Sequence, residues 1–287
     1  MPFVFAAIAP HGFPLIPDLS DDADGAPTTR AAMEELGRRA AAAGVEALVI
    51  AGPHGVRVDG AIALADTARA AGRLGWQGKT VELNVPVDGP LTDAIAATVR
   101  ARGIPIAMVG YAGNRRDQSV LPLDWGVLTP LWFLGHGRNM PGHGDVIADP
   151  PAADIGPPAA IVTPSRNLPR ETLVDFGRVV AEAATNDSRR VGFIASCDWG
   201  HAHRADGPYG FHPESAAVDA EVVAAVAAND LLRLIDLDEA RAQNAAIDGL
   251  WQALILAGAL ETVPMQAELL SYEAPTYYGM LVAVWAR

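Results

Sequence analysis

Residues 3–12 read FVFAAIAPHG, and residues 46–55 read EALVIAGPHG. Each stretch is a short apolar run, typical of a buried strand, that ends in the same motif, Pro-His-Gly. Between them, residues 29–43 are rich in Ala, Leu, Glu and Arg and predict a helix, which Gly44 closes. A strand–helix–strand order implies a parallel pair of strands whose ends lie on the same edge of a sheet.

The histidines that close these two strands are His11 and His54. In open α/β sheets, ligands bind at the edge where the parallel strands end. The proline fixes the approach to each turn, and the glycine permits a tight turn and the close approach of a ligand. We therefore expect His11 and His54 to share one metal-binding site.

The rest of the chain continues the alternation of strands and helices. We expect helices over residues 91–102, 170–185, 214–227 and 246–260, and strands over residues 104–110, 159–163, 191–196, 265–272 and 278–285. A stretch rich in Pro and Gly, residues 135–158, predicts a long loop. The alternation resumes after this loop, so residues 1–287 are expected to form one α/β domain. Its central mixed sheet would be flanked by helices, with the active site at strand ends.

Charge and composition exclude several classes of protein. The formal net charge is −13, Lys79 is the sole lysine, and no cluster of Lys and Arg is present, so we expect no nucleic-acid or membrane partner. No apolar run reaches the roughly 18 residues that a membrane span needs. The single cysteine, Cys197, precludes an intramolecular disulfide, and the N-terminal run lacks the basic region of a signal peptide. These features predict a cytoplasmic protein.

A site with two histidines needs a third ligand, and two carboxylates are candidates. Asp248 opens an apolar helix, where an N-cap aspartate would look the same, and Glu273 lies at a strand end in the segment SYEAP. Two imidazoles and one carboxylate form the facial arrangement of non-haem Fe(II) oxygenases, which leaves positions open for substrate and O₂.

Polar residues also follow the strand expected at residues 191–196. The segment SCDWGHAHR, residues 196–204, contains His201, a histidine that could shuttle protons near neutral pH. Cys197 as a nucleophile would need a paired histidine and a lowered pKa, and a small buried residue at a strand end is the simpler interpretation.

Six short segments, taken in order, resemble the class III extradiol ring-cleavage dioxygenases, the superfamily named for the β subunit of protocatechuate 4,5-dioxygenase. Each segment is short, but their order and spacing together make the match specific, and it spans nearly the whole chain. The segments are APHGFPLIP (9–17), GPHG (52–55), DWGVLTPL (124–131), ASCDWGH (195–201), Asp248-Gly249 with the helix to Leu260, and SYEAP (271–275).

By position, the resemblance makes His11 and His54 the two histidine ligands and His201 the acid–base residue that handles substrate and oxygen protons. The third ligand of ring-cleaving members is a glutamate near the start of the late helix. That place is closest to Asp248 here, with Glu273 as the alternative. Because aspartate is shorter than glutamate by one methylene, the backbone at Asp248 would have to approach the metal more closely.

One further residue departs from the family pattern. Trp125 stands where ring-cleaving members have a second active-site histidine. An indole can stack on an aromatic ring and donate one hydrogen bond, but it cannot shuttle protons. Together with Asp248, this departure indicates an unusual substrate, an altered reaction or lost catalysis. The superfamily also contains a branch that keeps the fold and a metal-competent site but acts mainly in binding or signalling.

The leading prediction is a non-haem Fe(II)-dependent extradiol dioxygenase that opens the ring of a catechol-like or aminophenol-like substrate with O₂. The alternatives are a non-catalytic, metal-competent binding protein of the same fold and a zinc-dependent hydrolase. Trp125, Trp199 and Tyr209 are expected to wall the substrate, and Arg204 to bind an anionic group on it. We also expect a homo-oligomer, or a separate small subunit as partner.

Overall fold

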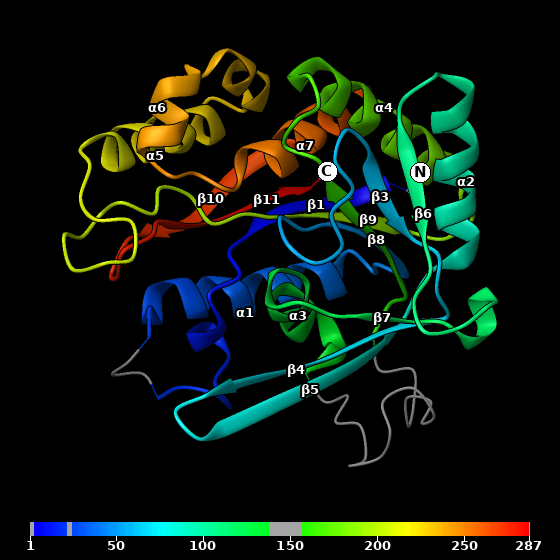
Figure 1. Ribbon diagram of the computed structural model, residues 1–287. Coiled ribbons are helices and arrows are strands. Elements are labelled where there is room, and N and C mark those ends of the chain that lie inside the picture. Colours follow the sequence, from blue (N-terminus) through cyan, green and yellow to red (C-terminus); the bar gives the residue numbers. More distant parts are fainter. Residues whose placement is uncertain (1–2, 22–24, 138–155, 287) are drawn as a thin grey trace.

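A computed structural model describes residues 3–21, 25–137 and 156–286 of the chain. Eight strands form a central sheet in the order β10-β11-β1-β9-β2-β8-β3-β6 (Figure 1). The strands are β1 (Phe3–Ala9), β2 (Ala47–Ala51), β3 (Ile62–Ala65), β6 (Ile106–Val109), β8 (Ala159–Pro164), β9 (Val191–Ser196), β10 (Gln266–Glu273) and β11 (Met280–Ala286). Parallel and antiparallel pairs both occur, so the predicted mixed sheet is confirmed.

Helices cover both faces of this sheet (Figure 1). The face covered by α2, α4, α5 and α7 holds one apolar core, and the face covered by α1 and α3 holds a second. The helices are α1 (Pro27–Ala42), α2 (Gly89–Ala101), α3 (Trp125–Leu131), α4 (Arg170–Asn186), α5 (Glu214–Ala227), α6 (Glu239–Asn244) and α7 (Leu250–Thr262). Short helical turns are η1 (Phe13–Leu15), η3 (Arg116–Gln118), η4 (Trp132–His136) and η5 (Leu231–Asp236).

Strand β2 shows why a continuous apolar run forms a strand here. Ala47, Val49 and Ala51 point into one core, and Leu48 and Ile50 point into the other. Successive strand residues face opposite sides of a sheet, so a strand that is covered on both faces needs apolar residues at every position.

A second, smaller sheet lies beyond α1 and α3 (Figure 1) and is formed by β5 (Lys79–Pro86), β4 (Arg69–Trp76) and β7 (Val120–Pro122). Strands β4 and β5 form a hairpin in which Trp76 pairs with Lys79. The two turn residues, Gln77 and Gly78, have φ values of 48° and 81°. Positive φ at both positions is typical of the tightest hairpin turn.

The strands that carry the two Pro-His-Gly motifs are parallel and end on the same edge, as predicted, but they are not neighbours. Strand β9 lies between β1 and β2 and is parallel to both. The ends of three strands therefore converge at this edge, and Ser196 and Asp198, at and just after the end of β9, contact His11.

For the expected loop and for membrane spans, the structure gives an answer only within the described residues. Most of the loop expected over residues 135–158 lies outside the described residues, which resume at Gly156. Within the described part of the chain, no helix is long and apolar enough to cross a membrane.

Candidate metal centre

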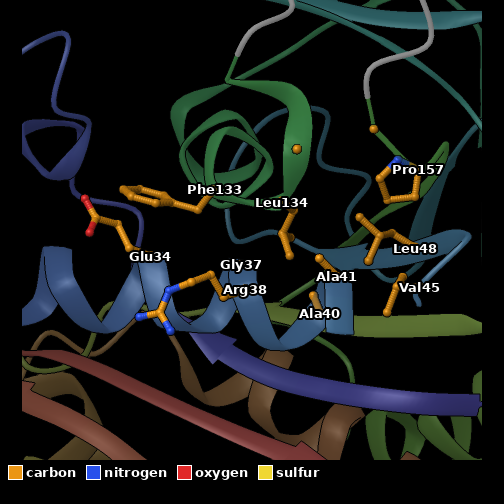
Figure 2. Close-up of a pocket in the computed structure, with 12 residues that line it drawn as sticks. Glu34, Gly37, Arg38, Ala40, Ala41, Val45, Leu48, Phe133, Leu134 and Pro157 are labelled. Carbon is orange, nitrogen blue, oxygen red and sulfur yellow. The ribbon is translucent and has the colours of Figure 1, made fainter. Parts of the chain in front are cut away.

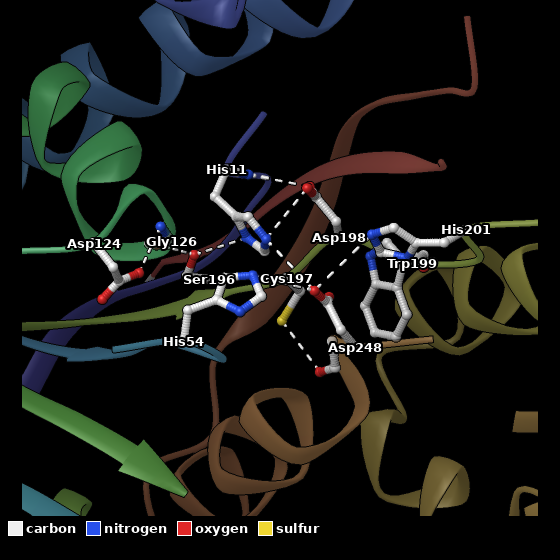
Figure 3. A network of polar contacts seen from close by, with 11 residues as sticks. His11, His54, Asp124, Gly126, Ser196, Cys197, Asp198, Trp199, His201 and Asp248 are labelled. Atoms are coloured by element: carbon white, nitrogen blue, oxygen red, sulfur yellow. Dashed lines mark hydrogen bonds and ion pairs between the residues drawn. The ribbon is translucent and has the colours of Figure 1, made fainter. Parts of the chain in front are cut away.

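His11 lies directly after β1, with its ring at the end of β9 (Figure 3). Its Nδ1 lies 3.1 Å from Oγ of Ser196. The Ser196 hydroxyl donates its one hydrogen to the carbonyl of Gly126. Ser196 can then only accept from the ring, so Nδ1 of His11 carries a hydrogen. In the neutral ring the lone pair lies on Nε2, the nitrogen that faces Asp248.

His54 follows β2, and its ring meets the ring of His11 edge-on, with 5.2 Å between centroids. The glycine of each Pro-His-Gly turn is needed for a different reason. Gly55 has a φ of +87°, a conformation that side chains rarely adopt. A Cβ at Gly12 would lie 2.3 Å from the hydroxyl of Tyr278. The two turns therefore set two imidazoles side by side.

Asp248 brings a carboxylate to both histidines from the start of α7. Its Oδ2 lies 3.6 Å from Nε2 of His11 and 3.6 Å from Nε2 of His54. The three possible ligand atoms all lie within 4.8 Å of one another. A metal about 2.1 Å from each ligand would hold neighbouring ligand atoms roughly 3–3.5 Å apart, so small side-chain shifts would complete such a site. Asp248 does not cap α7, since the N-cap residue is Gly249.

The short side chain of Asp248 reaches the histidines because, at the next residue, the backbone closely approaches the segment that follows β9. A Cβ on Gly249 would lie 2.6 Å from Cβ of Cys197 and 2.8 Å from the carbonyl oxygen of Asp198. Cys197 itself is buried, and its Sγ donates to the carbonyl of Gly249 at 3.3 Å. Burial raises the pKa of the Cys197 thiol, which fits a structural residue and not a nucleophile.

Asp198 is a second carboxylate beside His11. Its Oδ1 accepts from the backbone N–H of His11 at 3.1 Å, and its Oδ2 lies 3.3 Å from Nε2. Burial would lower the pKa of His11, but the negative charges of Asp198 and Asp248 outweigh burial and raise this pKa to about 9. Burial and the positive charge of His11 lower the pKa of His54 to about 4. The carboxylates therefore place a positive charge at His11, where a bound cation would replace the proton.

His201 adds a fourth group at the rim of this cluster. Its Nδ1 donates to the carbonyl oxygen of Trp199 at 2.6 Å, because a carbonyl can only accept. The lone pair on Nε2 is left free and lies 4.0 Å from Oδ2 of Asp248. The ring stacks on Tyr278, with 5.5 Å between centroids and 19° between planes. One nitrogen is therefore anchored, and the other can act as a base.

A pocket of about 410 Å³ opens on the same cluster. Its lining combines apolar and aromatic side chains with several polar groups, a combination typical of small-molecule sites. Its lining includes His54, Arg166, Asn167, His201, Tyr209, Asp248 and Trp251. The pocket joins two of the possible metal ligands, His54 and Asp248, to the possible base, His201, so a small molecule could contact both kinds of group.

A larger cavity, of about 620 Å³, lies elsewhere, between α1 and the segment that contains Phe133 and Leu134 (Figure 2). Its described lining is mostly apolar and includes no histidine, and Glu34 and Arg38 are its charged groups. This lining offers neither a set of metal ligands nor a base, so we place the chemistry at the smaller pocket.

Two of the expected substrate contacts lie at the site. Trp125 begins α3, and its ring lies 4.4 Å from the ring of His54, with the residue 42% exposed. Tyr209 lines the pocket, and its ring meets that of His201 edge-on at 5.6 Å. Both side chains are exposed enough to meet a ligand.

The structure does not place the other two expected contacts in the lining of the pocket. Trp199 is completely buried in the core, so its side chain presents no surface to a substrate, and only its carbonyl serves the site, through His201. Arg204 is not among the described residues that line the pocket, and it pairs with Asp206 through two hydrogen bonds, of 2.9 and 2.8 Å. Both residues follow strand β9, but the side chain of Trp199 packs in the core and that of Arg204 lies in solvent.

Glu273, the alternative third ligand, is engaged at the start of α1. Its Oε1 accepts from the backbone N–H and from the hydroxyl of Thr29, each at 2.7 Å. A carboxylate is favoured at a helix N-terminus, where backbone N–H groups lack partners. The structure therefore brings Asp248, and not Glu273, to the histidines.

Some residues of the site were not anticipated from the sequence. Of these residues, Asp198 alone has a signal in the sequence, since it lies shortly after a strand end, like the two histidines. Arg166 lies in a turn after β8 without any motif, and Trp251 reads as part of the apolar face of α7. Both residues line the pocket because of where the fold places β8 and α7.

Comparison with known protein families matches residues 6–283 to the family described as the catalytic LigB subunit of aromatic ring-opening dioxygenase. The chain belongs to the LigB family. This confirms the resemblance to the class III extradiol superfamily, and the match covers all six segments that carried it.

The chain is also similar to one curated protein and to one solved structure. The LigB-family chain is 25% identical, over 248 residues, to Protein CA_C1420 of Clostridium acetobutylicum. The match covers 85% of this chain and 49% of that protein, so the chain spans about half the length of this curated relative. In fold, it is similar to the crystal structure of uncharacterized protein JW3007 from Escherichia coli K12. The TM-score is 0.64 at 14% identity, over 99% of this chain and 100% of that one.

Proposed function

We propose that this LigB-family chain is a non-haem Fe(II)-dependent extradiol dioxygenase for a catechol-like or aminophenol-like substrate. The observation that carries the proposal is the convergence of His11 Nε2, His54 Nε2 and Asp248 Oδ2 beside an open pocket. Two histidines and one carboxylate, with open positions, are typical of non-haem Fe(II) oxygenases. When bound, the metal would orient the substrate and O₂ and pass electron density between them.

The state of Asp248 supports a metal at this point. Its Oδ1 is buried and has no hydrogen-bond partner among the described residues. A buried carboxylate oxygen without a partner is costly, and a cation would compensate it. Hydrogen bonding and charge from His11 hold the pKa of Asp248 below its usual range despite burial, so the carboxylate is ionised and ready to bind.

His201 would act as the base. Its anchored Nδ1 fixes the ring, and the free lone pair on Nε2 faces the pocket. A substrate hydroxyl held between the ligands and His201 would lose its proton to Nε2 and could recover it later, when the ring opens. Trp125 and Tyr209 would flank the aromatic ring and exclude water from it.

The test is metal analysis and oxygen uptake on protein purified without air. We expect about one iron per chain and O₂ consumption with at least one member of a panel of catechols and 2-aminophenols. The matched control is His54→Ala, which should lose both the iron and the uptake. Tight zinc together with esterase or amidase activity would contradict the proposal and favour a hydrolase.

A second candidate, a binding protein of the same fold, is favoured by Trp125. The indole covers His54 at the place where ring-cleaving members have a second histidine, and it cannot transfer protons. If the protein holds iron but consumes no O₂ with any compound of the panel, this second candidate replaces the first.

A further inference from the structure

Arg166 is a charged residue of the pocket whose guanidinium has no carboxylate partner in the described part of the chain. It lines the same pocket as His54, His201 and Asp248. In a chain with a net charge of −13, most arginines pair with nearby acids, as Arg204 does with Asp206. Arg166 is exposed on the wall of this pocket, so its guanidinium is available to a ligand.

The turn that carries Arg166 is held in place by its neighbours. The Oγ of Ser165 accepts from the backbone N–H of Gly60 at 3.0 Å and from that of Asn167 at 3.2 Å. The backbone N–H of Ser165 donates to the carbonyl of Ala61 at 3.2 Å. Arg166 therefore projects from a backbone that is fixed to the main body of the fold.

The side chain is positioned by Trp251. The guanidinium carbon lies 4.5 Å from the centre of the indole ring, and the indole N–H donates to the carbonyl of Arg166 at 3.3 Å. Trp251 is the second residue of α7, three residues after Asp248. Stacking on the indole restricts the guanidinium while leaving its N–H groups free to donate, at a defined place relative to the metal ligands.

The other charges of the pocket do not neutralise Arg166. Glu239 accepts from Nη2 of Arg170 at 2.9 Å and from Nε2 of Gln243 at 3.1 Å. Asp248 faces the histidines. The pocket thus has a negative end, at the metal ligands, and a separate positive group on its wall.

We propose that Arg166 is a specificity-determining residue that binds a carboxylate on the substrate while the ring oxygens lie at the metal ligands. The inference rests on the proposed function for the orientation of the substrate. Guanidinium binds carboxylate in a two-point, charge-assisted geometry, and the amide of Asn167 on the same turn can add a neutral contact.

The test compares each acid with its neutral amide in protein loaded with Fe(II) under nitrogen, so that binding is measured without turnover. The probes are 3,4-dihydroxybenzoate and its amide, and 3,4-dihydroxyphenylpropanoate and its amide, which differ in the length of the arm. By calorimetry, at least one acid should bind wild type about tenfold more tightly than its amide, the size expected for one charge-assisted contact. Arg166→Gln should remove the preference, and Arg166→Lys should restore part of it.

Two controls separate this role from general charge effects. Arg204→Gln tests the arginine expected from the sequence, and Arg115→Gln removes an exposed arginine that pairs with Asp117 and is not among the residues that line the pocket. Both variants should keep the preference for the acid. The proposal is overturned if wild type shows no preference, if no probe binds, or if Arg166→Gln keeps the preference.

The outcome is separable from that of the proposed function. A preference that depends on Arg166, without any O₂ uptake, would leave the binding role in place and remove the dioxygenase. O₂ uptake by a protein that binds acid and amide with equal affinity would leave the dioxygenase in place and remove the binding role of Arg166.

Discussion

The two ring nitrogens of His201 have different roles. Nδ1 is bound to the carbonyl of Trp199, and Nε2 faces the pocket at 4.0 Å from Asp248. The stack on Tyr278 fixes the plane of the ring. This arrangement suits a base that acts beside the metal without binding it.

Replacing His201 with Ala should therefore leave the metal in place and slow turnover. We expect kcat to fall by about 10²- to 10⁴-fold, the usual contribution of a positioned base, with iron content unchanged. His212→Ala is the control, because His212 lies in the same region but accepts from the backbone N–H of Glu214 and does not line the pocket. Loss of iron in His201→Ala would instead make His201 a ligand.

For individual site residues, the sequence predicts those that follow a strand better than those that lie in other turns. His11 and His54 share a motif at strand ends, and their closeness follows from the parallel direction of the strands. The motif does not say whether a side chain after a strand points inward or outward, which is why the sequence did not predict the burial of Trp199 or the pairing of Arg204 with Asp206. Arg166 had no local signal, because its position depends on packing against α7.

Among the elements, α4 and α7 pack most closely, at one glycine on each helix. A Cβ on Gly177 would lie 1.9 Å from the carbonyl oxygen of Ile255, and a Cβ on Gly258 would lie 1.9 Å from that of Val174. The two backbones are in direct contact there. This packing holds α7, and with it Asp248, against the sheet.

Gly258→Ala should therefore destabilise the protein, although Ala is the better helix former. In an open helix, this change would stabilise by about 0.5–1 kcal/mol. Here the added methyl meets backbone, and we expect a loss of roughly 1–3 kcal/mol in the free energy of unfolding. Urea denaturation measures the change. An unchanged or higher midpoint would show that the helices can separate without cost.

The elements themselves were predictable where the hydrophobic pattern is strong. The expected helix over residues 214–227 coincides with α5, and the strands at both ends of the chain are also found. The β4–β5 hairpin was missed because its outer half is exposed, including Trp76 and Lys79, and carries little apolar alternation. The position of β9 between β1 and β2 could not be predicted from the sequence, because parallel pairing between distant segments has no local sequence signal.

For the molecule as a whole, the possible metal ligands join distant parts of the chain. His11 follows β1, His54 follows β2, and Asp248 precedes α7. A ligand that binds only the folded state stabilises all of it. The homo-oligomer, or the separate small subunit, stays a prediction that sedimentation can test.

Adding Fe(II) under nitrogen should raise the melting temperature of metal-free protein, and a chelator should reverse the effect. At a free metal concentration of 100 times Kd, the stabilisation is about 2.7 kcal/mol. For a chain of this size, that amounts to a rise of roughly 5 °C. His11→Ala should show no rise. An equal rise in this variant would place the metal elsewhere.

The central claim is that His11, His54 and Asp248 bind one metal ion together, and the iron content of two variants tests it most directly. Asp248→Ala removes the carboxylate at the histidines, and Glu273→Ala removes the carboxylate at the start of α1. Both are purified without air, beside wild type. We predict about one iron per chain in wild type and in Glu273→Ala, and almost none in Asp248→Ala. Full iron in Asp248→Ala, or its loss in Glu273→Ala alone, would contradict the account.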